Sequence, residues 1–93
     1  MIVGTLRVTL ELPGPRNLKD KRRIVQSLLR RLHNEFAVAA SEVDNQDTWR
    51  QATLGIACVA NDGRHADRVL AQVVRYIERE REAVLVDYEV EMR

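Results

Sequence analysis

Basic side chains are concentrated in one short part of this sequence. Between Arg16 and Arg31 the chain carries seven basic residues and a single acid, Asp20. A helix that begins there would present these cations beside its own free N–H groups, and both attract anions. The pattern predicts binding of phosphate groups, such as those of RNA, although a basic helix face that only meets water has the same pattern. The candidate anion- or RNA-binding residues are Arg16, Lys19, Lys21, Arg22, Arg23 and Arg30.

The elements that position these residues follow from the spacing of the apolar side chains. Strict alternation over residues 2–12 is typical of a strand with one buried face. From Leu18 to Phe36 the apolar residues recur at helical spacing, and Asn17 with Asp20 resembles a capping box. We expect strands at residues 2–12, 37–43, 52–60 and 83–92, and helices at residues 18–36 and 63–81.

The last of these strands also alternates. The five apolar residues at even-numbered positions are expected to share one face. The residues at odd-numbered positions, which are mostly acidic, are expected to share the opposite face. The first set is Val84, Val86, Tyr88, Val90 and Met92, and the second is Leu85, Asp87, Glu89 and Glu91.

The order βαββαβ predicts an α+β fold, the ferredoxin-like sandwich. Two right-handed crossovers joined by a hairpin give a four-stranded antiparallel sheet of order 4-1-3-2 with both helices on one face. The 93 residues, 1–93, are expected to form a single domain. In this topology the start of the first helix, the end of the second strand and the hairpin tip at residues 44–51 meet at one end of the domain.

Lys21 differs from the other basic residues because, around the helix axis, its side chain is expected to lie within the apolar stripe of the helix. Its methylene stem can follow the edge of the core while the ammonium emerges at the domain end. Since Glu42 is expected at that end, we predict a Lys21–Glu42 ion pair, either structural or part of a site. The hairpin offers a candidate contact loop at Asp47, Trp49 and Arg50, in which Trp49 stacks on a partner or covers the core.

Composition excludes several classes of function. The net charge is only +1, so a polycationic protein is excluded, and a single cysteine, Cys58, excludes an intrachain disulfide. His33 and His65 lack the spacing of metal ligands, so no metal and no cofactor are expected. The N-terminal residues lack a signal-peptide pattern and no apolar run is long enough for a membrane span, so we expect a cytoplasmic protein and no membrane partner.

The chain resembles the YlxP-like family of small bacterial proteins of unknown function. Three segments carry the resemblance: residues 18–23 (Leu-Lys-Asp-Lys-Arg-Arg), residues 36–43, and residues 46–49 (Gln-Asp-Thr-Trp) leading to residues 54–57 (Leu-Gly-Ile-Ala). The resemblance implies the ferredoxin-like fold over residues 2–92 and implies no established activity. It also points towards translation, because relatives are often encoded near ribosome-maturation genes.

Three functions remain open from the sequence. The first is a non-enzymatic protein that binds RNA or a ribosomal particle through its basic first helix. The second is a protein-interaction module or homodimer that uses the open face of the sheet, where Gly55, Ala57 and Val59 are flanked by Val3 and Leu85. The third is an enzyme that acts on a small anionic substrate at the Lys21–Glu42 end.

Overall fold

The computed structural model describes all residues, 1–93, and has the six predicted elements in the predicted order. Each element begins and ends within three residues of its expected bounds. The elements are β1 (Ile2–Glu11), α1 (Leu18–Glu35), β2 (Ala39–Asp44), β3 (Gln51–Ala60), α2 (Gly63–Glu78) and β4 (Val84–Met92).

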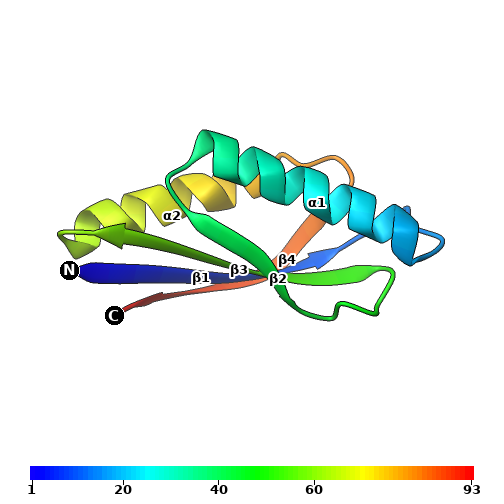
Figure 1. Cartoon of the computed structure of the whole chain (residues 1–93), viewed down its shortest axis with the longest axis horizontal. Coiled ribbons are helices and arrows are strands. Elements are labelled where there is room, and N and C mark those ends of the chain that lie inside the picture. The colour runs from blue at the N-terminus through cyan, green and yellow to red at the C-terminus, as the bar shows by residue number, and fades with distance from the viewer.

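The strands form one antiparallel sheet of order β2-β3-β1-β4, which is the predicted order 4-1-3-2. Both helices lie on the same face of this sheet, and the opposite face, called the outer face below, carries no helix (Figure 1). The predicted α+β ferredoxin-like fold is therefore confirmed. The strand after the hairpin, β3, has apolar or small residues on both of its faces, which is typical of a central strand, and it does lie between β2 and β1.

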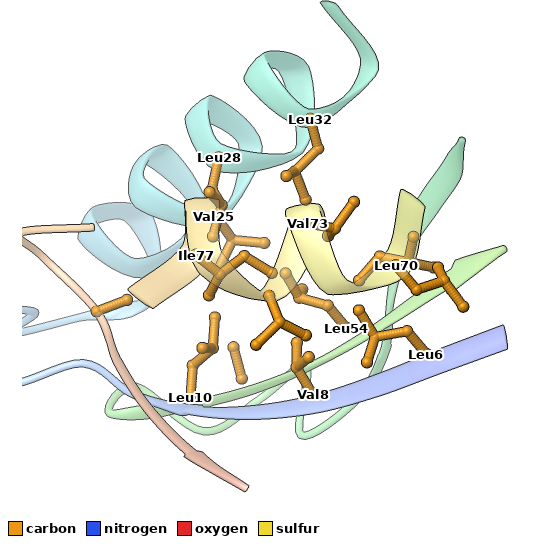
Figure 2. Packing of buried hydrophobic residues seen from close by; sticks show 14 of the residues in the cluster. Leu6, Val8, Leu10, Val25, Leu28, Leu32, Leu54, Leu70, Val73 and Ile77 are labelled. Carbon is orange, nitrogen blue, oxygen red and sulfur yellow. The ribbon is translucent and has the colours of Figure 1, made fainter. Parts of the chain in front are cut away.

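The core lies between the sheet and the two helices. Leu6, Val8 and Leu10 of β1 point from the sheet towards the helices, where they meet the apolar stripes of α1 and α2 (Figure 2). The stripe of α1 includes Val25, Leu28 and Leu32, and that of α2 includes Leu70, Val73 and Ile77. Burying each of these side chains contributes about 1.5–3 kcal/mol, so packing fixes which face of α1 is turned to water.

Side-chain caps begin both helices, and the cap of α1 lies where the sequence predicts it. The Asn17 side chain accepts a hydrogen bond from the Asp20 N–H at 2.8 Å, and the Asp20 carboxylate accepts one from the Arg16 N–H at 3.2 Å. Asp62 caps α2 in the same way by accepting from the His65 N–H at 2.9 Å. The bonds from the Asp20 and His65 N–H groups satisfy donors that the first helical turn leaves without partners.

The prediction of which face the first side chains of β4 occupy is wrong. A register shift opposite Thr9 and Leu10 pairs Leu85 with Leu10 on the core face and Val84 with Glu11 on the outer face. One extra residue in a strand reverses the direction of every side chain beyond it, and a simple alternation does not reveal such a bulge. Tyr88 and Val90 do lie on the helix side, opposite Val8 and Leu6.

Candidate functional site

The basic residues of α1 form an exposed surface. Lys19, Arg22, Arg23 and Arg30 recur at spacings that bring them to one side of the helix, and all four are exposed. Together with Asp20, Gln26 and Ser27 they line one shallow hollow that has no apolar residue. We call these four cations the basic face of α1. Arg16, also exposed, precedes the helix by two residues.

Most of this basic face has no acidic partner. Arg23 lies 3.8 Å from Glu82 Oε1, but both side chains are more than half exposed, so this ion pair contributes little. Lys19, Arg22 and Arg30 have no carboxylate within 4.0 Å. These three charges are exposed and remain available to an anion.

Lys21 belongs to a different environment, because its side chain is completely buried. Its Nζ lies 2.9 Å from Glu42 Oε2 and donates a hydrogen bond to the Asn45 carbonyl oxygen. The predicted Lys21–Glu42 ion pair is therefore present. The two charged groups are close, but their angle does not make a hydrogen bond. The buried Glu42 Oε2 therefore has an ion-pair partner and no hydrogen-bond donor. The Lys21 ammonium is therefore separate from the exposed basic surface.

Asn45 connects this buried pair to the hairpin. It adopts the left-handed conformation, with φ of 61°, and its Nδ2 donates to Thr53 Oγ1 at 2.8 Å. A left-handed asparagine is tolerated because its side chain can hydrogen-bond locally. The turn thus directs the Asn45 carbonyl oxygen to Lys21 and ties the β2–β3 hairpin to the start of α1.

The candidate contact loop extends beyond this turn. Asp47, Trp49 and Arg50 are all exposed, and the Trp49 side chain is accessible over 49% of its surface. No ion pair joins the basic face to the acids of the hairpin. Asp44 instead lies 3.3 Å from Arg7 of β1.

A cluster around Arg31 was not predicted from the sequence. Arg31 lies 2.7 Å from Glu80 Oε2 and 6.0 Å from the centre of the Tyr76 ring, which meets Phe36 edge to face at 5.7 Å. Desolvation is the largest single influence on the pKa of Arg31 and acts to lower it, but the hydrogen bonds and charges of Glu80 and Tyr76 together outweigh it and leave the pKa raised. The only sequence signal is the position of Arg31 next to the apolar stripe, which turns it towards α2 while its side chain stays 41% exposed.

The outer face of the sheet holds a second hollow, of about 460 Å³. Its floor includes Gly55 and Ala57 of β3, and charged side chains at its rim include Arg7 and Glu89. A Cβ at Gly55 would come within 2.9 Å of Val43 Cγ1, so glycine allows Val43 to pack closely over the strand.

No three His, Cys, Asp or Glu side chains lie close enough together to hold a metal ion. Neither helix combines the length and the apolar character that crossing a bilayer requires.

The geometry thus describes a small α+β domain with an exposed basic helix and a buried ion pair at one end. The same fold occurs in the de novo designed protein Foldit4, with a TM-score of 0.52 and 14% identity over 99% of this chain and 94% of that chain. Residues 3–90 match the family described as protein of unknown function (DUF503), and the chain belongs to this family. It is also similar to the uncharacterized protein YlxP of Bacillus subtilis (strain 168), with 36% identity over 62 residues, or 67% of each chain.

Proposed function

We propose that this protein is a non-enzymatic, cytoplasmic RNA-binding protein that uses the basic face of α1, on free RNA or on the RNA of a ribosomal particle. The observation that carries the proposal is the group of three cations, Lys19, Arg22 and Arg30, that lie together on one helix without an acidic partner. Arg16 extends the group beyond the start of the helix, and Arg23 lies within it. Lys21 has no part in it, since its ammonium is buried.

The chemistry of these side chains suits a phosphate backbone. A guanidinium presents a planar set of donors that matches two phosphate oxygens, while an ammonium acts as a point charge. Neutralising phosphates releases condensed counterions, which favours binding at low salt and gives little sequence preference. The outer face fits RNA less well because β1 and β3 have no aromatic side chain on which a base could stack, and Asp87, Glu89 and Glu91 would repel phosphate.

Co-sedimentation with ribosomal subunits tests the proposal. The purified protein is centrifuged with the small and large subunits at about 50 mM and about 200 mM salt, over the range in which phosphate contacts weaken steeply. We expect binding at the lower salt and loss of most of it at the higher. Failure to sediment with either subunit, together with no retention of naked ribosomal RNA on a filter at low salt, would rule the proposal out.

The outer face favours a second function, a homodimer. Its hollow has a floor of small residues, so the sheets of two copies could approach closely, with Arg7 of one copy near Glu89 or Glu91 of the other. Leu85 does not contribute to this face, because the bulge turns it to the core. Sedimentation velocity gives the test: a dimer that survives high salt and is lost in Ala57→Arg would support this function, and a monomer at all concentrations would exclude it.

A further inference from the structure

The edge strand β4 exposes an unusual share of large apolar side chains. Of the nine large apolar residues that are exposed in the protein, five lie on this strand, with between 37% and 50% of each surface accessible. They are Val84, Val86, Tyr88, Val90 and Met92. Since β4 has a neighbour only on the β1 side, its other edge is free.

The hydrogen bonds show which backbone groups this edge presents. Arg93 and Val3 exchange both of their backbone hydrogen bonds, at 2.8 and 2.9 Å. In an antiparallel ladder the hydrogen-bonded pairs alternate, so Tyr88, Val90 and Met92 direct their N–H and C=O groups away from β1. The Tyr88 N–H fits this arrangement, because it donates to the Asp87 Oδ1 of its own strand at 2.9 Å.

Side chains form two different rows along this edge. On the helix side, Tyr88 and Val90 border a groove of about 360 Å³ between β4 and α2. Its lining is part apolar and part charged: it includes Ala71 and Val74 and also Asp67, Arg75 and Glu78. On the outer side stands a row of three exposed acids, Asp87, Glu89 and Glu91. Only one of the three, Glu91, has an ion-pair partner, Arg93 at 3.0 Å.

We propose that this edge binds an extended segment of a partner protein in which apolar and basic residues alternate. The segment adds a fifth strand through hydrogen bonds to the Tyr88 C=O group, whose N–H partner is already Asp87, and to the N–H and C=O groups of Val90 and Met92, a recognised mode of peptide binding. Its apolar side chains occupy the groove against α2, and its lysines or arginines pair across the strands with the acidic row. Opposite charges at cross-strand positions stabilise such a pairing.

A second copy of this chain does not fit the same edge. Antiparallel pairing of two β4 strands would place the acids at residues 87–91 of one copy against the same acids of the other, and like charges directly opposite each other are destabilising. The acidic row therefore disfavours pairing of this edge with a second copy of the chain and favours pairing with a strand that carries basic side chains.

Two synthetic peptides test the proposal by NMR titration of the full chain. Both have nine residues, one alternating valine with lysine and the other valine with glutamate. We expect the lysine peptide to bind, with chemical-shift changes concentrated on β4 and α2, and the glutamate peptide not to bind. The α1 variant Arg22→Glu/Arg30→Glu should bind the lysine peptide as the wild type does, which separates this site from the RNA site.

Variants of the strand sharpen the test. Val90→Pro removes one outward N–H, which is tolerated at a strand edge, and should weaken binding at least tenfold. Glu89→Lys/Glu91→Lys keeps the backbone and should reverse the preference between the peptides. The proposal is overturned if the two peptides bind equally, if the double variant keeps its preference for lysine, or if neither peptide binds, in which case the acids only protect the edge.

Discussion

Replacing Lys21 by methionine is expected to lower the free energy of unfolding by about 3 kcal/mol. Methionine has a similar length and no charge, so the change removes the ammonium while it keeps most of the packing. What remains is a Glu42 carboxylate that is only 18% exposed, and an Asn45 carbonyl oxygen without its donor. An unpaired group of this kind bears its full desolvation cost. Urea unfolding of the two proteins measures the difference.

The chain supplies a matched control two residues earlier. Lys19→Met makes the same chemical change on the exposed side of α1 and should alter stability by no more than about 0.5 kcal/mol. The double variant Lys21→Met/Glu42→Leu removes both charges and should recover most of the loss, because a buried ion pair can be replaced by apolar groups at little cost. Equal stability of the two single variants would show that the Lys21–Glu42 contact contributes nothing to the fold.

Reversing two charges on the basic face should reduce RNA affinity by roughly 30-fold at low salt. The variant is Arg22→Glu/Arg30→Glu, chosen because neither arginine has an ion-pair partner whose loss would complicate the result. Each reversal removes an attraction of about 0.5 kcal/mol and adds a repulsion of similar size, for a total of about 2 kcal/mol. Fluorescence anisotropy of a labelled RNA measures the dissociation constant.

The control for this variant lies on the other helix. Arg64→Glu/Arg68→Glu also reverses two exposed arginines and changes the net charge by the same amount, but on α2. If binding depends on the basic face, the α2 variant stays within a few-fold of the wild type. An equal loss in both variants would mean that only net charge matters, and that α1 has no special role.

Much of the fold could be predicted because each element follows a regular pattern. The alternation in β1 and the apolar stripes of both helices depend on burial against one core, which is the strongest term in folding. The topology then placed the start of α1 beside the end of β2. That placement, together with the position of Lys21 within an apolar stripe, was sufficient to predict the ion pair with Glu42.

The failures have physical reasons of their own. The bulge that turns Leu85 inward is one additional residue in β4. Because Val84, Leu85 and Val86 are all apolar, the sequence is compatible with the pairing both with and without the bulge. The Arg31–Glu80 and Arg7–Asp44 pairs join residues far apart in the chain, and their choice of partner depends on side-chain reach within the folded protein. Arginine in particular can pair in several directions from one backbone position.

The dependence of RNA affinity on salt tests the central proposal most directly. For single-stranded RNA the slope of log K against log salt is about −0.7 for each phosphate contact, so the four cations of the basic face predict a slope near −3. Arg22→Glu/Arg30→Glu should make the slope shallower, with a magnitude of about 1.5 or smaller. Arg64→Glu/Arg68→Glu should leave the slope unchanged. A wild-type slope close to zero, or one that the α1 variant does not alter, would contradict RNA binding through this helix.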